Sequence, residues 1–420
     1  MKILRSIVFV TILIMINQVY ASDWPQYLGP ERNAVSGEKG LLRTWPKEGP
    51  KVLWTVPLGE GFGGPAVSEG KVYVYDRLDD KINVLRCFDL NTGHEDWTFS
   101  FEAPGSVSYD GSRSVPSIDG NRIYVCDVFG NFHCVDKNTH KALWHKNIWT
   151  DFSKAAIPQW AIAQNPLVYR NMVIIASQTK EAGLVAYDKQ NGKIIWKTSR
   201  LPGVAGYVSP EIVKINGADQ LVMISATRPE GSEPGAVRGF DPKDGKLLWS
   251  YNGWKCKTPV PNVTEIGSNQ LFVTAGYLSG GALIQIDKKV NSWEAKEIMF
   301  SKEFGTHVHP PIFYKGYLYV QCTNNQVRNG FMCMDLKGNI KWKTGRKPNF
   351  DKGGFILADD MIISSDGEKM LYLIDPNPEE FRVLAKAELL ETKQAWAPLA
   401  LSDGKLLIRD QKQMKCVLVK

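Results

Sequence analysis

The sequence predicts an all-β fold: an eight-bladed β-propeller of four-stranded antiparallel blades, with the ring closed by the N-terminal strand. One pattern of strands and turns recurs eight times, at steps of about 43 to 51 residues. An Asp closes the third strand in seven units, and in five of these a Trp follows seven or eight residues later. The 37 Gly, 23 Pro, 13 Trp, 15 Tyr and 17 Phe also favour turn-rich strands over helices.

The first 21 residues are predicted to be a signal peptide rather than part of the fold. Lys2 and Arg5 precede an apolar run from Ile7 to Ile16, and the segment Val19 to Ala21 offers small residues at the two positions that signal peptidase reads. The run is about half the ~20 residues that span a bilayer, which disfavours a retained transmembrane helix. We expect cleavage after Ala21, a periplasmic or secreted location, and no stable membrane insertion after cleavage.

The overall composition is that of a globular protein with a large core. Hydrophobic residues make up 43% and charged residues 23% of the chain, which excludes a disordered protein. The formal net charge is +7, but no run of five like charges occurs. Nucleic-acid binding needs clustered positive charge, so we expect no nucleic-acid partner.

Each repeated unit of about 46 residues has the order strand, tight turn, strand, loop, strand, tight turn, strand, which is typical of a propeller blade. A Pro, once replaced by Phe, marks the first strand: Pro65, Pro116, Pro166, Pro210, Pro261, Pro311, Phe355 and Pro398. The Asp that closes the third strand is Asp89, Asp136, Asp188, Asp241, Asp287, Asp335 or Asp375. The Trp of the fourth strand is Trp97, Trp144, Trp196, Trp249 or Trp342.

The ring is predicted to close by pairing the two ends of the chain. The last unit, residues 395–420, supplies only three strands, whereas Lys51 to Val56 carries Trp54 where a fourth-strand Trp belongs. Pairing them leaves no long unpaired edge. The predicted organisation is therefore a signal peptide at 1–21, an N-terminal extension at 22–50 and the propeller at 51–420.

The repeat resembles the pyrroloquinoline-quinone-like (PQQ-like) repeat. The residues that carry the resemblance are the turn from Cys87 to Gly93 and Trp97, and the match covers roughly residues 51–420. This family includes quinoprotein alcohol dehydrogenases and the propeller lipoprotein of the β-barrel assembly machinery. The opening Asp23 to Pro30 is further similar to exported bacterial members without assigned activity. The resemblance implies the fold more strongly than a function, since propellers host many unrelated functions.

Most repeated residues are predicted to be structural. The Asp residues precede tight turns, where a carboxylate accepts backbone N–H groups. The tryptophans are expected to dock blade on blade, and the small residues two positions before the Asp, including Cys87, Cys134 and Cys333, to be buried by packing. Cys126 and Cys134 flank a hairpin turn symmetrically. A strained disulfide between them is a considered alternative.

One face of the propeller is predicted to carry the function. Tight turns such as Glu69-Gly70 join strands one to two and three to four, and these turns share one face. The other face carries the connections from strand two to three and from blade to blade. Its expected long segments are Glu102 to Arg113, Trp149 to Ala163, Arg228 to Arg238 and Gln321 to Gly330. Function belongs on this long-loop face.

Residues two or three positions before the repeated Pro should ring the channel mouth on that face. They are Arg113, Gln164, Tyr207, His309, Lys352 and Trp396, joined by His307 on the same side of its strand. This polar, aromatic and cationic set favours a polar or anionic ligand, a saccharide or a peptide segment. The competing interpretation is a water-filled rim without a ligand. His307 and His309 alone do not make a metal site, because zinc needs three or four ligands.

The sequence therefore favours an exported, non-catalytic propeller that binds a protein partner or a polar or anionic ligand through its long-loop face. We expect no catalytic residue, no metal and no cofactor. The alternative is a PQQ-dependent quinoprotein dehydrogenase, to which the repeat points. A carbohydrate-active enzyme would need two carboxylates about 5 to 9.5 Å apart, for which only Asp110 and Asp351 stand near the predicted mouth.

Overall fold

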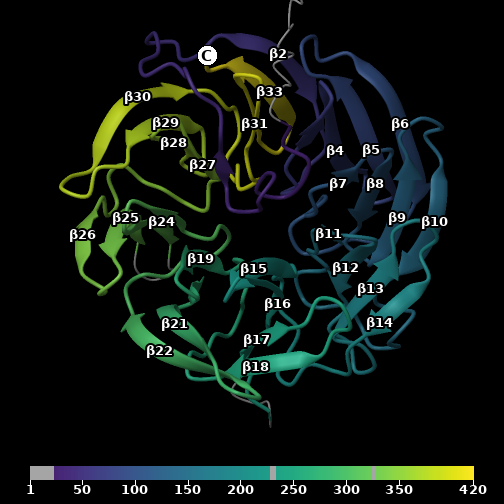
Figure 1. The fold of residues 1–420 in the computed structure, drawn as a ribbon. Coiled ribbons are helices and arrows are strands. Elements are labelled where there is room, and N and C mark those ends of the chain that lie inside the picture. Colours follow the sequence, from purple (N-terminus) through teal and green to yellow (C-terminus); the bar gives the residue numbers. More distant parts are fainter. Residues whose placement is uncertain (1–22, 228–232, 324–327) are drawn as a thin grey trace, which may run out of the picture.

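The structure is a computed structural model that describes residues 23–227, 233–323 and 328–420. Eight sheets, each built on a blade of four antiparallel strands, stand around a central axis, which confirms the eight-bladed β-propeller (Figure 1). The predicted signal peptide lies outside the described residues. Within the described ranges, no helix is long and apolar enough to cross a membrane.

Seven blades each take four consecutive strands, and each blade runs from an inner to an outer strand. Blades 1 to 4 are β3 (Ala66–Ser68), β4 (Lys71–Leu78), β5 (Ile82–Asp89), β6 (Glu95–Glu102); β7 (Ser117–Asp119), β8 (Arg122–Cys126), β9 (Asn131–Asp136), β10 (Ala142–Asn147); β11 (Leu167–Tyr169), β12 (Met172–Ala176), β13 (Leu184–Asp188), β14 (Ile194–Lys197); and β15 (Glu211–Ile215), β16 (Ala218–Ile224), β17 (Val237–Phe240), β18 (Leu247–Tyr251). Blades 5 to 7 are β19 (Thr264–Gly267), β20 (Gln270–Ala275), β21 (Gly280–Lys288), β22 (Trp293–Ser301); β23 (Ile312–Tyr314), β24 (Tyr317–Thr323), β25 (Arg328–Asp335), β26 (Ile340–Lys343); and β27 (Phe355–Ala358), β28 (Met361–Ser365), β29 (Met370–Asp375), β30 (Arg382–Glu388).

The eighth blade joins the two ends of the chain, as predicted. It consists of β31 (Ala400–Ser402), β32 (Lys405–Arg409), β33 (Gln413–Leu418) and, as its outer strand, β2 (Val52–Pro57). Trp54 of β2 lies opposite Cys416 of β33. Because β2 pairs antiparallel with β33, the N-terminal strand closes the ring without an unpaired edge.

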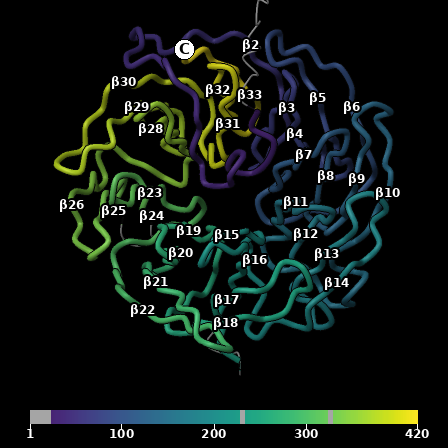
Figure 2. The backbone as a smooth tube through the Cα atoms, in the orientation of Figure 1, coloured from purple at the N-terminus to yellow at the C-terminus, as the bar shows by residue number. Residues whose placement is uncertain are grey.

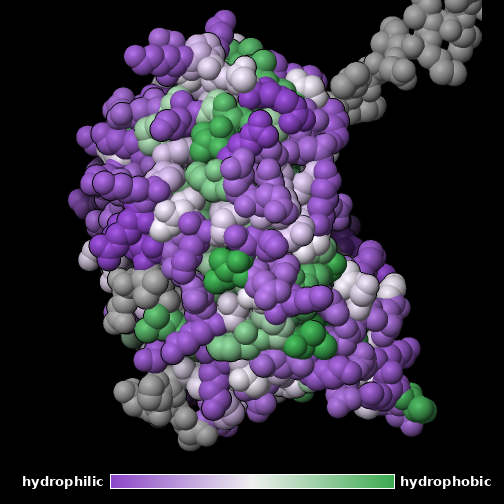
Figure 3. Space-filling model, turned by 90° about the vertical axis from the view of Figure 1, so that its left-hand side faces the viewer, coloured by the Kyte–Doolittle hydropathy of each residue, from purple (hydrophilic) through white to green (hydrophobic). Residues whose placement is uncertain are grey.

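Burial follows the position of a strand within its blade. Middle strands such as β12 are buried at every residue, because neighbouring blades cover both faces of the sheet. The outer strand β6 alternates between half-buried and exposed residues along its whole length. Seen from the side that carries β26 and β30, hydrophobic residues are scattered among hydrophilic ones (Figure 3).

Most of the repeated tryptophans dock one blade onto the next, although Trp249 Nε1 donates to Gln220 Oε1 of its own blade at 2.7 Å. Each lies opposite a small residue on the third strand, as in Cys87 with Trp97, Ala186 with Trp196 and Gly239 with Trp249. A Cβ at Gly239 would lie 2.2 Å from the Trp249 indole, so the ring fills the space that a side chain would need. Indole Nε1 donates to a carbonyl of the following blade, from Trp54 to Leu90 at 2.9 Å, Trp196 to Pro242 at 3.2 Å and Trp342 to Asn377 at 2.8 Å.

All seven cysteines are buried free thiols, which confirms the predicted shielding of Cys87, Cys134 and Cys333. Cys126 lies opposite Phe132, whereas Cys134 lies opposite Tyr124. The two cysteines therefore sit two residues out of register, and they lack the direct opposition that a cross-strand disulfide needs. The considered Cys126–Cys134 bond is not formed.

Residues 23–50 form a strap across the short-turn side of the ring. Trp24 exchanges two backbone hydrogen bonds with Val67 of blade 1, at 2.9 and 2.8 Å. The short strand β1 (Val35–Ser36) then pairs parallel with β27 of blade 7. Figures 1 and 2 show this purple segment beside β27, on the inner side of the ring. The strap thus ties the start of the chain to blades 1 and 7, the two neighbours of the closing blade 8.

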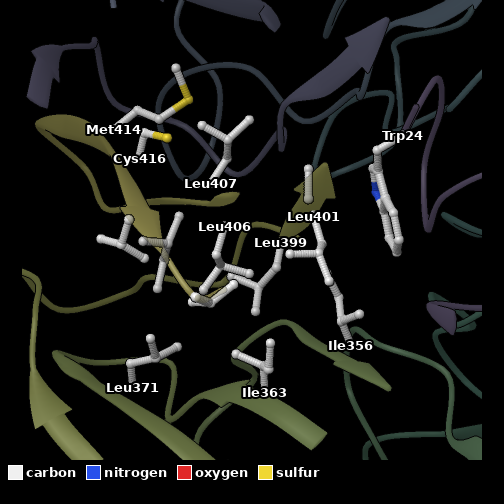
Figure 4. Packing of buried hydrophobic residues seen from close by; sticks show 14 of the residues in the cluster. Trp24, Ile356, Ile363, Leu371, Leu399, Leu401, Leu406, Leu407, Met414 and Cys416 are labelled. Atoms are coloured by element: carbon white, nitrogen blue, oxygen red, sulfur yellow. The ribbon is translucent and has the colours of Figure 1, made fainter. Parts of the chain in front are cut away.

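One hydrophobic core joins the strap to blades 7, 8 and 1. Trp24 is 1% exposed and packs in one cluster with Ile356, Ile363, Leu401 and Leu406 (Figure 4). Burying an aromatic ring of this size contributes a few kcal/mol relative to leaving it exposed. The strap is therefore part of the folded unit.

Candidate functional site

The two faces of the ring differ in their connections. Hairpin turns such as Ser68–Lys71 and Ser402–Lys405 occupy the short-turn face. The long-loop face carries the blade-to-blade connections, including residues 103–116 and 148–166. The predicted long segment from Gln321 to Gly330 is shorter in the structure, because β24 extends to Thr323 and β25 begins at Arg328. Likewise, Arg238 lies within β17 rather than in a loop.

A cavity of about 260 Å³ opens at the centre of the long-loop face. Every blade contributes to it a residue from the connection that leads into its inner strand: Phe62, Arg113, Asn165, Tyr207, Asn262, His309, Lys352 and Trp396. Three further aromatic side chains, Tyr109, Trp160 and Tyr277, come from loops, and Tyr27 comes from the strap. Residues far apart in the sequence thus converge on the propeller axis.

The structure brings six of the seven predicted site residues together. Arg113, Tyr207, His307, His309, Lys352 and Trp396 all line this cavity. Gln164 does not line it. Its Nε2 donates to the Val208 carbonyl at 2.9 Å and its Oε1 accepts from the Ala176 amide at 3.3 Å, so it joins neighbouring blades. The adjacent Asn165 lines the cavity instead, because successive residues of an extended chain point in opposite directions.

Aromatic rings form two walls of the cavity. In the first, Phe62 stacks on Trp396 with ring centroids 5.3 Å apart, and Tyr109 lies 5.9 Å from Trp396. In the second, Trp160 stacks on Tyr277 at 5.9 Å with an interplanar angle of 8°. The first wall belongs to blades 8 and 1 and the second to loops of blades 3 and 5, so the walls stand on opposite sides of the axis.

The two cations of the cavity are held by groups of their own loops. Arg113 donates to the carbonyl oxygens of Ser108, of Tyr109 at 2.6 Å and of Gly111 at 3.3 Å. Burial lowers the pKa of Arg113 to about 10, which leaves it charged at neutral pH. Lys352 Nζ lies 2.9 Å from the Asp351 carboxylate and 4.3 Å above the Trp396 ring. Both cations therefore already have partners.

The histidines are packed into the wall. Burial lowers the pKa of His309 to about 4, so its ring is neutral at pH 7. Its Nε2 lies 2.9 Å from the Trp396 carbonyl oxygen, and His307 makes an edge contact with Tyr277 at 4.8 Å. No Asp or Glu lines the cavity, and no group of three or more His, Cys, Asp or Glu in the described part of the chain could hold a metal ion.

The strap closes the cavity from below. Arg32 is fully buried and donates to the carbonyl oxygens of Pro166 at 3.2 Å and Pro210 at 3.4 Å. Glu211 is buried nearby, and desolvation raises its pKa to about 8 against the opposing charge of Arg32. A separate cavity of about 580 Å³, lined in part by Arg32, Lys214 and Glu265, lies on the short-turn side. The central channel is thus divided into two cavities.

Several residues that line the cavity were not predicted from the sequence, and some of them share one position in the repeat. Positions three before the repeated Pro or Phe355 line the cavity in seven blades: Phe62, Arg113, Ala163, Tyr207, Thr258, Val308 and Lys352. Applying this offset uniformly would have added Phe62, Ala163, Thr258 and Val308. Tyr109, Trp160 and Tyr277 lie in loops of unequal length outside the repeat, so the sequence carries no equivalent signal for them.

Comparisons with known proteins agree with the fold. A family model described as outer membrane protein assembly factor BamB matches residues 81–344. The outer membrane protein assembly factor BamB of Vibrio cholerae is 21% identical over 87% of this chain and 88% of its own length. The tetrathionate hydrolase of Acidithiobacillus ferrooxidans is 24% identical over 56% of this chain and 45% of its own length.

Among solved structures, the quinohemoprotein alcohol dehydrogenase from Comamonas testosteroni superposes with a TM-score of 0.69 at 14% identity, over 95% of this chain and 80% of that one. At this identity the likeness shows the fold alone. The chain spans less than half the length of the first curated relatives it matches. The matched family model covers more than half of the chain. The chain therefore belongs to the PQQ-like β-propeller repeat family whose model is described as outer membrane protein assembly factor BamB.

Proposed function

We propose that this chain is an exported, non-catalytic binding protein that holds a polar ligand, or a polar group of a protein partner, in the long-loop cavity. The observation that carries the proposal is the convergence of all eight blades on one concave, aromatic-lined site. A rigid scaffold that presents converging side chains in a closed-ended cavity suits recognition. Relatives called outer membrane protein assembly factors support a protein partner as one class of occupant.

The chemistry of the lining supports binding rather than catalysis. No carboxylate lines the cavity, and the neutral His309 is held by the Trp396 carbonyl. Glycoside hydrolysis needs two carboxyl groups flanking the bond that breaks. Asp351 is paired with Lys352 and lies outside the lining. The cavity therefore lacks the acid and base that such a reaction requires.

The alternative, a quinoprotein dehydrogenase, requires a site for pyrroloquinoline quinone. That cofactor is a planar tricarboxylate, so it must be held by several cations and by a divalent metal with oxygen ligands. Here Arg113 and Lys352 are engaged by their own loops, and no carboxylate in the lining can ligate a metal. The residues present do not fit the cofactor.

The proposal is tested by measuring the melting temperature of the mature protein with neutral sugars, carboxylic acids and short peptides. At least one class should stabilise the wild type. Ala163→Trp should abolish that stabilisation, because Ala163 is half-buried in the lining and an indole there fills the cavity. Val290→Trp, at a position 96% exposed on the outer hairpin β21–β22, is the matched control.

Failure of every class to stabilise the wild type would contradict the proposed function, as would equal stabilisation of Ala163→Trp. Calorimetric titration with pyrroloquinoline quinone and Ca²⁺ tests the alternative. We expect no stoichiometric heat. A micromolar affinity together with oxidation of an alcohol would overturn the binding proposal in favour of the dehydrogenase.

A further inference from the structure

The cations, aromatic rings and buried polar atoms of the cavity together indicate which class of ligand fits it. Its two cations carry the charge that would attract an anion. However, Lys352 is paired with Asp351 at 2.9 Å, and Arg113 is surrounded by three carbonyl oxygens of residues 108–111. An anionic ligand would have to compete with these partners. The positive charge of the rim therefore gives an anion a smaller advantage than the sequence suggests.

The aromatic walls favour an occupant with flat, apolar faces. Phe62 and Trp396 stack at 5.3 Å on one side of the axis, and Trp160 and Tyr277 stack at 5.9 Å on the other. Tyr207 lies 5.5 Å from Trp160 and extends the second wall toward the floor. A ring that enters the cavity can thus stack on aromatic surfaces on two sides.

Buried polar atoms in the same cavity favour an occupant that also donates and accepts hydrogen bonds. Asn262 and His309 are 1% and 3% exposed and both line the cavity. His309 Nδ1 and Trp396 Nε1 are buried without a hydrogen-bond partner among the described residues, whereas the Asn262 side chain hydrogen-bonds the Glu211 carboxyl. Leaving such groups unsatisfied costs about 1–3 kcal/mol each, so their satisfaction by an occupant is favourable.

These atoms differ in polarity. Trp396 Nε1 can only donate. His309 Nε2 donates to the Trp396 carbonyl at 2.9 Å, which leaves Nδ1 of the neutral ring as an acceptor. A carboxylate or phosphate offers acceptors alone and cannot satisfy Nδ1. Hydroxyl groups both donate and accept, and therefore match both kinds of atom.

We infer that the long-loop cavity recognises a neutral saccharide ring, stacked between the aromatic walls with its hydroxyl groups on His309 and Trp396. A sugar ring combines C–H faces for stacking with a hydroxylated edge. The volume of about 260 Å³ is below the ~300–1,000 Å³ typical of drug-sized ligands, which limits the occupant to one or two rings. This inference rests on the proposed function and names the ligand class of the same site.

The test is isothermal titration calorimetry of the mature protein with five probes. Cellobiose, maltose and diacetylchitobiose are the neutral sugars, and glucuronate and benzoate are the anions. At least one neutral sugar should bind the wild type more tightly than either anion. Trp160→Ala should weaken that sugar at least about tenfold, the size expected for one aromatic stack. Trp160→Phe keeps a ring and should stay within about threefold. The melting temperature of each variant reports whether it folds.

Each other outcome decides against the inference in a distinct way. Tight binding of glucuronate or benzoate without binding of a neutral sugar would overturn the saccharide and leave the proposed function standing. Sugar binding that is equal in Trp160→Ala and in the wild type would place the site elsewhere. No heat with any probe would overturn the saccharide class. The melting-temperature panel with peptides and carboxylic acids then decides whether the proposed function falls with it.

Discussion

Glu211 lies buried beneath the long-loop cavity, and replacing it with Gln should change how stability depends on pH. Desolvation raises its pKa from the ordinary 4.5 to about 8, with Arg32 opposing the shift. An acid with a raised pKa holds its proton more tightly in the folded state than in the unfolded chain. Its contribution to stability is therefore fully present below pH 4.5 and is lost as the pH rises through about 8.

The size of the effect follows from the shift. One pKa unit corresponds to about 1.4 kcal/mol, so the wild type should lose about 2 to 4 kcal/mol of unfolding free energy at this site between pH 5 and pH 8. Glu211→Gln has nearly the same shape and cannot ionise. Its stability should therefore be close to that of the wild type at pH 5 and exceed it by about 2 to 4 kcal/mol at pH 8.

Guanidinium denaturation followed by tryptophan fluorescence at pH 5 and pH 8 measures both curves. Glu102→Gln is the matched control, because it removes an exposed carboxylate from the outer strand β6 of another blade and should keep the pH dependence of the wild type. If the unfolding free energies of the wild type and Glu211→Gln change equally between pH 5 and pH 8, Glu211 is not desolvated beneath the cavity, and the result contradicts this prediction.

Three further predictions concern closure, packing and export. Trp54→Ala should destabilise the protein by about 3–5 kcal/mol in urea denaturation, because Trp54 is 8% exposed at the seam that closes the ring; a change below about 1 kcal/mol would contradict this. None of the seven thiols should react with a thiol reagent in the native protein, since all are buried; rapid labelling of Cys87, Cys134 or Cys333 without denaturant would refute their packing. Mass spectrometry of the exported protein should find Ser22 at the N-terminus, and a retained segment 1–21 would argue against cleavage.

The fold could be predicted because the repeat encodes it locally. Seven of the eight blades carry an Asp at the end of the third strand, and most blades carry a Trp opposite a small residue, and these set the register of the outer strands. Ring closure also followed from local evidence, because Trp54 stands in the position of a missing fourth-strand residue. The path of residues 23–50 could not be predicted in this way. Arg32 contacts the carbonyls of Pro166 and Pro210, and Trp24 contacts Val67. The repeat of the sequence does not predict these contacts.

The candidate site was predictable only where it follows the repeat. Arg113, Tyr207 and Lys352 occupy one repeated position and line the cavity as expected. Gln164, His309 and Trp396 each stand two positions before their Pro, but His309 and Trp396 line the cavity whereas the Gln164 side chain lies in the contact between blades. Trp160 and Tyr277 reach the cavity through loops whose course depends on tertiary contacts with Tyr207 and His307. The hydrogen bond from Arg113 to Tyr109 and the ion pair of Lys352 with Asp351 likewise depend on loop geometry, which the sequence pattern does not specify.

The most direct test of binding through the long-loop cavity is a crystal structure of the mature protein soaked with the compound that stabilises it most. We predict ligand density between the Phe62–Trp396 pair and the Trp160–Tyr277 pair, above Tyr27. Density confined to the short-turn cavity beside Lys214 and Glu265, or to the outer strands, would contradict it.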